Sequence, residues 1–207
     1  MTYIYKLTIV SLSLLLASCF AESEVNLIES AEDLGFTFSG SEEDIEEFLS
    51  EDVLSLMIDL GLEINTGSSP LNLIGTYVAS PYCRLSSTNP DASLGCGFSD
   101  FFVQFSNQNE ESLTIDYQGF QLDEFDNITF FESGSGFISG DLNGDFTIIV
   151  RAENPETGNE NATAFSGRIT SQGIQFYQDI FVPGINSNFE LQADLFVDED
   201  NLAEFFE

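Results

Sequence analysis

Few residues in this chain have side chains suited to catalysis or metal binding. The 207 residues include no histidine, which excludes Ser-His and Cys-His nucleophilic systems and His-ligated zinc or haem sites. Asp141, Asn143 and Asp145 have the oxygen spacing of a calcium loop, but Phe146 and Ala152 stand where an EF-hand needs glycine and glutamate, so a hairpin turn is favoured. Among 36 acidic residues some pair always lies at the spacing for glycoside hydrolysis, so pairing carries no weight. We expect no enzyme, no metal site and no cofactor.

Two of the three cysteines, Cys83 and Cys96, are predicted to form a disulfide. They flank a polar stretch that contains Pro90 and Gly95 and would otherwise be an unconstrained loop. Two cysteines beyond Cys19 are the even number expected of an exported domain in an oxidising compartment. Closing a ring of about this size stabilises the fold by roughly 3 kcal/mol. A reactive pair or a metal site is the alternative, disfavoured because the spacing is not Cys-x-x-Cys and no histidine is present.

The N-terminus has the pattern of an export signal. Met1–Lys6 carries the only lysine, and residues 7–17 form an apolar stretch too short to span a membrane, which takes roughly 20 residues. Small residues then precede Cys19. This stretch resembles the lipobox of bacterial lipoproteins, Leu-Ala-Ser-Cys, matched here by Leu16, Ala17, Ser18 and Cys19.

The lipobox resemblance implies that residues 1–18 are a signal peptide, removed before Cys19. The cysteine thiol would be diacylated and its new amino group acylated, and two or three chains anchor a protein stably where one does so only marginally. Phe20, in place of the aspartate that marks inner-membrane retention, favours an outer-membrane lipoprotein, periplasmic or surface-facing. A plain secretory signal with a chance cysteine is the alternative.

The chain is strongly acidic. Its net charge is −32, and loss of Lys6 with the signal leaves three arginines against 36 acids, or −33. Such a charge repels nucleic acid and anionic lipid headgroups over a Debye length of about 8–10 Å, so nucleic-acid binding is not expected. The favoured interpretation is a solvated surface suited to high salt. Divalent-cation binding or a coat that repels partners is the alternative.

Residues 19–40 are predicted to be an acidic tether, and residues 41–62 to contain an amphipathic helix. Ser41 is a suitable N-cap and Gly61 a suitable C-terminal cap, and apolar residues recur between them at helical spacing. These residues are Ile45, Phe48, Leu49, Val53, Leu56, Met57 and Leu60. A restart at Ser50 would give two short helices instead. The stripe is expected to pack on the following domain; docking of a partner protein to helix 41–60 is the alternative.

Over residues 70–197 the apolar period changes to two. This predicts a mainly β domain, an antiparallel meander of about eight or nine strands that closes into a barrel and so removes its edges. A two-sheet sandwich is the alternative, and residues 198–207 are expected to be an acidic tail. Turns are predicted at Asn143-Gly144, Gln172-Gly173 and Pro183-Gly184. In one strand, Ile174, Phe176 and Ile180 alternate with Gln175, Tyr177 and Asp179.

The segment LIGTYVAS resembles the opening strand of lipocalin-type barrels, with Gly75 and Tyr77 in place of Gly-x-Trp. SGRITSQGIQF is similar to hairpins of small bacterial lipocalin-like lipoproteins. The resemblance implies a barrel that binds a small apolar ligand; because the chain has no tryptophan, a Phe-filled barrel in a structural or interaction protein is the alternative. Arg151 and Arg168 are expected in surface ion pairs, unless they point inward and contact a ligand carboxylate. The candidate ligand-binding residues are Tyr77, Phe101, Phe105, Arg151, Arg168 and Phe176.

Overall fold

The computed structural model describes residues 36–125, 127–153, 158–187 and 190–206. The predicted signal peptide, Cys19 and most of the predicted tether lie outside these residues. Two helices come first, α1 (Glu42–Leu49) and α2 (Glu51–Leu60). The strands are β1 (Gly75–Ala79), β2 (Tyr82–Ser87), β3 (Gly95–Cys96), β4 (Phe101–Asn109), β5 (Thr114–Leu122), β6 (Ile128–Gly140), β7 (Asp145–Glu153), β8 (Glu160–Ile169), β9 (Gly173–Val182), β10 (Asp194–Asp198) and β11 (Leu202–Phe205).

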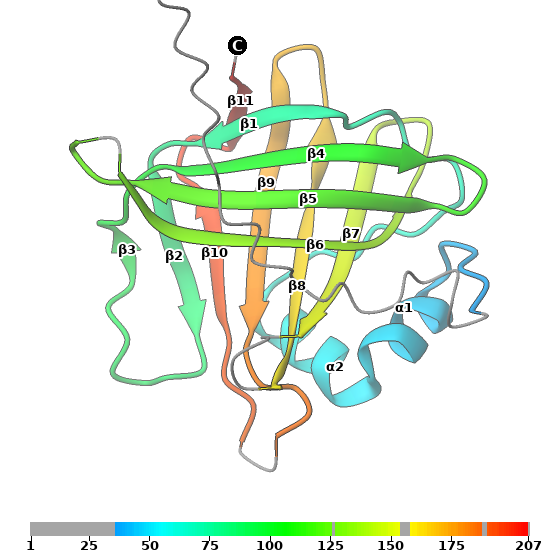
Figure 1. Cartoon of the computed structure of the whole chain (residues 1–207), viewed down its shortest axis with the longest axis horizontal. Helices are drawn as coiled ribbons and strands as arrows, with labels where there is room; N and C mark the ends of the chain where they lie inside the picture. Colours follow the sequence, from blue (N-terminus) through cyan, green and yellow to red (C-terminus); the bar gives the residue numbers. More distant parts are fainter. Residues whose placement is uncertain (1–35, 126, 154–157, 188–189, 207) are drawn as a thin grey trace, which may run out of the picture.

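Eight strands close into an antiparallel barrel. They follow the order β1-β4-β5-β6-β7-β8-β9-β11, and β11 pairs back to β1. In Figure 1, β1, β4, β5 and β6 form one layer that crosses β7, β8 and β9 at a large angle. The Asn143-Gly144 turn joins β6 to β7 as predicted, with Gly144 at a positive φ of 95°. The predicted barrel is confirmed, and the sandwich alternative is wrong.

Strand β9 changes partner halfway along one edge. Its first residues pair with β11, as Gln175 does with Leu202, and its later residues pair with β10, as Gln178 does with Val197. Phe176 lies between the two segments at a positive φ of 55°, and its backbone N–H donates to the carbonyl of Asn201. From this fork, β10, β2 and β3 continue the sheet as an extension of the barrel wall.

Two boundary predictions are wrong. The segment expected to be an acidic tail, residues 198–207, contains β11, which closes the barrel and fully buries Ala203. The acidic residues around β11 obscured its strand pattern: Glu204 is on the solvent side, and the preceding residue, Ala203, is apolar and buried. The polar stretch after the first strand is not all loop either, because its first residues belong to β2 and pair with β10.

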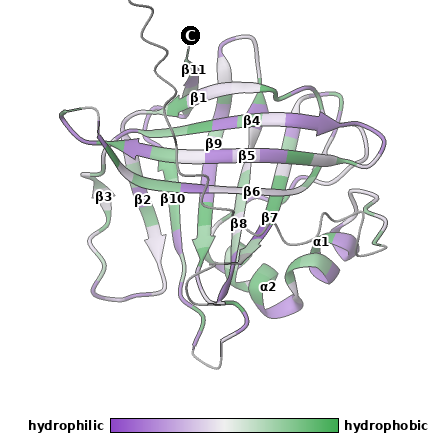
Figure 2. Cartoon of the chain, in the orientation of Figure 1, coloured by the Kyte–Doolittle hydropathy of each residue, from purple (hydrophilic) through white to green (hydrophobic). Residues whose placement is uncertain are grey.

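The apolar stripe of residues 41–60 packs on the outside of the barrel. The Ser41 side chain caps α1 by accepting from the Asp44 N–H at 3.2 Å, and Ser50, at a positive φ of 86°, separates the two helices. The alternative of two short helices is therefore correct, and packing on the barrel is confirmed. The buried partners are Ile45, Leu49, Val53, Leu54 and Met57 on the helices and Phe137, Ile149, Ala164, Ile180 and Leu195 on the strands. Figure 2 shows hydrophobic residues both on α2 and on the nearby β7 and β8.

The two helices leave their acidic side chains exposed, so a partner protein that bound this segment would meet Glu42, Glu43, Glu46 and Glu51 rather than the apolar stripe. In the described part of the chain no helix is both long and apolar enough to cross a membrane.

Candidate functional site

The predicted ligand-binding residues divide between the inside and the outside of the barrel. Tyr77, Phe101 and Phe105 lie in the interior core and are buried. Arg151 lies outside, where it pairs with Glu160 and donates to the Phe48 carbonyl of α1 at 3.1 Å. The remaining two residues, Arg168 and Phe176, are also at the surface. Neither predicted arginine points into the barrel, so neither can contact a ligand carboxylate there.

Arg168 and Phe176 are exposed for different reasons. Arg168 forms a two-pronged ion pair with Asp145, with Nε 2.6 Å from Oδ1 and Nη2 2.9 Å from Oδ2. Phe176 is 56% exposed because the bulge at its positive φ reverses the alternation of β9. Beyond the bulge Tyr177 and Asp179 face the interior, while Ile180 lies under the helices. The predicted facing of this strand is therefore wrong after Gln175.

The interior contains one buried carboxylate with an incomplete set of hydrogen bonds. Asp179 is 5% exposed, and its Oδ1 accepts a hydrogen bond from the Tyr82 hydroxyl at 2.7 Å. Its Oδ2 has no hydrogen-bond partner, and the nearby Tyr177 hydroxyl is also buried without one. Burial raises the pKa of Asp179 to about 7, although the neighbouring Tyr82 and Tyr177 hydroxyls act to lower it.

A second carboxylate lies close enough to interact with Asp179. Burial of its carboxyl group, and then the charge of Asp179, raise the pKa of Glu132 to about 8, while the Tyr117 hydroxyl beside it lowers that pKa. Glu132 retains some exposed surface, so it lies nearer to solvent than Asp179 does. We call Tyr82, Tyr117, Glu132, Tyr177 and Asp179 the acid cluster.

Small residues on β5 and β6 make room for the acid cluster. A Cβ on Gly134 would come within 3.2 Å of the Tyr117 ring and 2.7 Å of Val150. A Cβ on Gly119 would come within 2.6 Å of the Phe101 ring, and 3.3 Å from the Glu132 side chain. Both positions therefore need glycine so that the aromatic rings can cross the strands.

Aromatic rings form the walls around the acid cluster. The Tyr82 ring is stacked between Phe101 and Phe196, with centroid distances of 5.1 and 4.7 Å. Phe165 lies 5.0 Å from Tyr117, and the 39% exposed Phe130 lies 6.3 Å from Phe101. The faces and edges of these rings form an apolar lining next to desolvated carboxylates.

Arg84, the third arginine, was not among the predicted site residues. Its guanidinium carbon lies 4.8 Å from the Phe98 ring centroid and 5.3 Å from that of Phe196, and Nη2 lies 3.3 Å from Asp194. The rings of Phe98 and Phe196 therefore already contact one cation, the guanidinium group of Arg84. Arg84, Arg151 and Arg168 are each paired with a surface acid, and among the described residues none forms an ion pair with Asp179 or Glu132.

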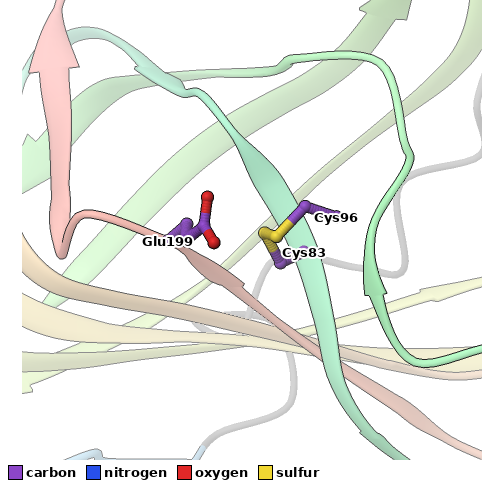
Figure 3. A group of neighbouring side chains, drawn as sticks. All are labelled: Cys83, Cys96 and Glu199. Carbon is purple, nitrogen blue, oxygen red and sulfur yellow. A yellow bond between two sulfur atoms is a disulfide. The ribbon is translucent and has the colours of Figure 1, made fainter.

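The predicted disulfide between Cys83 and Cys96 is confirmed, and it joins directly opposed residues of β2 and β3. Glu199 lies beside the disulfide in Figure 3, and its carboxylate is within 4.8 Å of both sulfur atoms, but the sulfurs are bonded to each other and are not thiolate ligands. The disulfide lines an open groove of about 560 Å³ on the outer side of the barrel extension. Leu85, Leu94 and Phe176 make this groove largely apolar.

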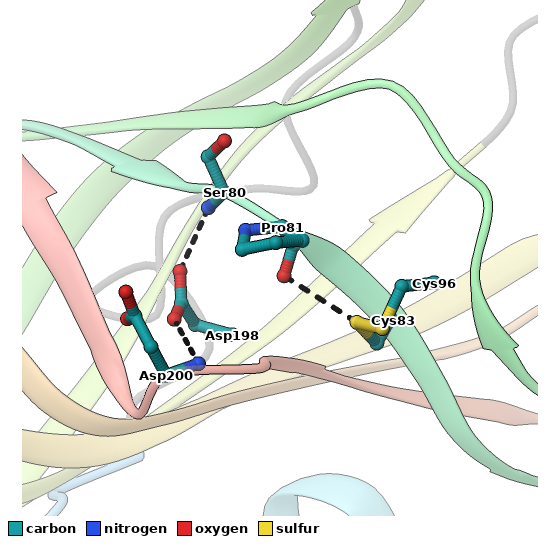
Figure 4. Close-up of a disulfide and its surroundings, with 6 residues drawn as sticks. All are labelled: Ser80, Pro81, Cys83, Cys96, Asp198 and Asp200. Atoms are coloured by element: carbon teal, nitrogen blue, oxygen red, sulfur yellow. Dashed lines mark hydrogen bonds between the residues drawn. A yellow bond between two sulfur atoms is a disulfide. The ribbon is translucent and has the colours of Figure 1, made fainter.

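A third raised carboxyl pKa, that of Asp198, has a structural explanation. Asp198 accepts hydrogen bonds from the backbone N–H groups of Ser80 at 2.7 Å and Asp200 at 3.1 Å, which fixes the turn between β10 and β11 (Figure 4). Burial and then the Asp200 side chain raise the pKa of Asp198 to about 6, while the backbone N–H groups of Ser80 and Leu202 lower it. Both Asp198 oxygens have donors, in contrast to Asp179.

The acid cluster is the arrangement with the most evident chemical use. Below about pH 7 the buried Asp179 and the partly buried Glu132 hold their protons unless a positive charge enters, because ionisation in a desolvated site is costly. A ligand ammonium group could satisfy Asp179 Oδ2, and the surrounding rings could contact both its charge and an apolar body. No family model matches the sequence, and no curated protein or solved structure is significantly similar to it.

Proposed function

We propose that the protein is a lipid-anchored lipoprotein of the cell envelope whose barrel binds a small molecule with an apolar body and a positively charged amine. The observation that carries the ligand proposal is the unpartnered, buried Oδ2 of Asp179 beside the unpartnered Tyr177 hydroxyl. Buried polar groups are nearly always hydrogen-bonded; the Tyr177 hydroxyl lies near enough to lower the pKa of Asp179, and we propose that an additional group completes the hydrogen bonds of both.

The charge of the ligand follows from its surroundings. The charge of Asp179 raises the pKa of Glu132, and no described arginine balances the two carboxyl groups. A cation would lower both pKa values, whereas a ligand carboxylate would raise them further. Asp179 and Glu132 therefore change the prediction of a purely apolar ligand. The proposed ligand has an apolar body that fits the aromatic lining and a positively charged head group.

Saturation-transfer NMR with benzylamine and benzyl alcohol tests the proposed ligand class, using residues 20–207 at about pH 8. The two probes share an aromatic body and differ in charge. We expect saturation transfer to benzylamine and much less to benzyl alcohol. Equal transfer to both would contradict a charged head group, and transfer to neither would contradict binding of this ligand class.

Two matched variants locate the binding. Asp179→Asn should abolish transfer to benzylamine, because the amide retains the shape but not the charge. Asp145→Asn changes a surface acid that pairs with Arg168 outside the barrel, and it should leave the transfer unchanged. Loss of transfer in both variants would indicate nonspecific attraction to an acidic chain.

The lipid anchor is tested separately. Cells supplied with an alkynyl fatty acid should label the wild-type protein and leave Cys19→Ala unlabelled. Equal labelling of the two would contradict the lipoprotein assignment, and neither result depends on the barrel site.

The second candidate function is a non-enzymatic structural or interaction lipoprotein with a filled barrel. The complete burial of Phe105, Phe146 and Phe165 in the interior favours it, because these side chains occupy volume that a ligand would need. Under this function the acid cluster would be protonated and structural, and benzylamine would show no specific binding.

A further inference from the structure

The outer face of β1, β4, β5 and β6 has an aromatic row. The strand registers align Val78 with Phe102, Phe102 with Phe120, and Phe120 with Phe131. Side chains directly opposed in neighbouring strands lie on the same face of a sheet, so these four residues cross the barrel in one line. Phe102 and Phe120 are stacked at 5.0 Å, and Phe206 contacts Phe102 edge-on at 5.2 Å.

The aromatic row, defined as Val78, Phe102, Phe120, Phe131 and Phe206, lies on a face that no described helix covers; Val78, Phe102 and Phe120 are half-buried. Phe131 is 53% and Phe206 is 55% exposed. The adjoining end of the β5–β6 hairpin adds Phe125 and Ile128, which are 74% and 57% exposed. Large exposed apolar side chains that adjoin one another mark an interaction surface more often than scattered ones do.

The strands beneath the row differ in charge from the rest of this acidic chain. Within β1, β4, β5 and β6 the acids are Asp116 and Glu132, and Glu132 belongs to the interior acid cluster. The positions beside the row are uncharged, with Gln104, Gln118 and Ser133 on neighbouring strands. Acids occur at its two ends, at Glu204 and in the β5–β6 turn. The strands carry no arginine, and Asp116 and Glu204 leave the face weakly acidic in a chain of net charge −32.

We propose that the aromatic row lies against a bilayer with a zwitterionic surface. Phenylalanine is among the side chains that interfacial surfaces bury in a bilayer, and a zwitterionic surface does not repel an acidic protein as an anionic surface would. A second copy of the chain would bring two strongly like-charged molecules together, which disfavours self-association through this face.

The proposed lipid anchor brings the barrel near a bilayer without selecting the face that contacts it. This proposal rests on the proposed anchor at Cys19, which precedes Phe36 by 17 residues. An extended segment of that length reaches at most about 60 Å, so the anchor keeps the barrel close to the membrane. Close approach makes even weak interfacial contacts effective, because the second contact becomes intramolecular.

The orientation also places the acid cluster near the membrane surface. Phe130, which contacts the interior Phe101, is the neighbour in sequence of Phe131 in the row. Because successive strand residues point to opposite faces, Phe130 faces the interior and Phe131 the proposed bilayer, so β6 separates the acid cluster from the bilayer face.

A tryptophan scan on the lipidated, full mature protein tests the proposal, because the chain has no tryptophan of its own. Phe131→Trp reports the aromatic row, and Phe176→Trp is a matched control of similar exposure in the outer groove. Each variant is reconstituted in phosphatidylcholine vesicles with and without brominated acyl chains, which quench tryptophan within the bilayer. We expect a blue-shifted, quenched emission from Phe131→Trp and an unquenched emission from Phe176→Trp.

Flotation of the same vesicles separates the anchor from the orientation. A protein that does not float lacks the anchor, which overturns the proposed membrane attachment itself. A protein that floats with equal quenching of both variants, or with none, overturns the aromatic row as the bilayer face. A blue shift of Phe131→Trp without quenching, dependent on protein concentration, would instead identify a second copy as the occupant and overturn the lipid proposal.

Discussion

Two tyrosines in the same barrel interior show how a structural group differs from a candidate binding group. Tyr77 is fully buried, and its hydroxyl donates to the Leu73 carbonyl at 2.9 Å. Tyr177 is also buried, but its hydroxyl has no partner and neither does the nearby Asp179 Oδ2. The Tyr77 hydroxyl has its hydrogen bond within the chain, whereas the acid cluster contains buried polar atoms without one. A filled core and a candidate site are thus distinguished by hydrogen bonding rather than by burial.

The largest expected effect on stability comes from a substitution in the region around Tyr77. Phe105 is buried and packs 6.0 Å from Tyr77, so Phe105→Ala should lower the free energy of unfolding by about 3–5 kcal/mol. Urea denaturation of wild type and variant measures this difference. A loss below about 1 kcal/mol would show that the interior relaxes around the cavity, and the contrast between the two regions would then be wrong.

A substitution in the acid cluster should instead raise the free energy of unfolding at high pH. A pKa raised from 3.8 to about 7 means that folded Asp179 binds a proton that the unfolded chain releases. The stability of the wild type therefore falls as pH rises from about 4 to about 7, and the nearby Glu132, with a pKa of about 8, extends the fall. Asp179→Asn removes the Asp179 contribution, because an amide has no charge to desolvate.

We expect Asp179→Asn to be more stable than the wild type by about 2–3 kcal/mol at about pH 8 and to match it near pH 4. This is less than the roughly 4 kcal/mol that the change in pKa represents, because Tyr82 donates more weakly to an amide than to a carboxylate. Denaturant titrations at both pH values measure it. A variant less stable than the wild type at pH 8 would mean that ionised Asp179 contributes to folding.

The smallest and sharpest comparison removes one hydroxyl from each tyrosine. Tyr77→Phe leaves the buried Leu73 carbonyl without its donor and should cost about 1–2 kcal/mol. Tyr177→Phe removes a hydroxyl that makes no hydrogen bond of normal geometry, so near pH 5, where Asp179 holds its proton, its effect on stability should be close to zero. Thermal unfolding of both variants at one pH gives the answer, and equal losses would show that the Tyr177 hydroxyl is satisfied after all.

The sequence predicted the parts of the fold that depend on local patterns. The period-two segments, the Asn143-Gly144 turn and the cysteine pair led to a barrel with a disulfide, because each pattern has one dominant structural outcome. The Ser41 cap and the helical spacing likewise located the helices. What the patterns lacked was any signal for β11, whose alternation is short and sits among acids.

The inward position of Tyr177 and Asp179 could not be predicted from the sequence because of one residue. Phe176 adopts a positive φ that no bulky residue favours, so the alternation in β9 could not be extrapolated past it. Tyr177 and Asp179 consequently face inward, as Ile174 does, although the alternation had set them on the opposite face from Ile174, and Phe176 faces outward. Arg84 was overlooked for a related reason, since the polar stretch around it gave no strand pattern for β2.

Carbon-13 NMR of the Asp179 side-chain carboxyl, titrated with acid and base in the presence and absence of benzylamine, tests the central claim most directly. Without the amine we predict a pKa of about 7, caused by burial. Benzylamine should lower that pKa, because its positive charge stabilises the ionised carboxylate. An Asp179 pKa near 3.8 without ligand, or one that benzylamine leaves unchanged, would contradict the proposal that the acid cluster is a cation-binding site.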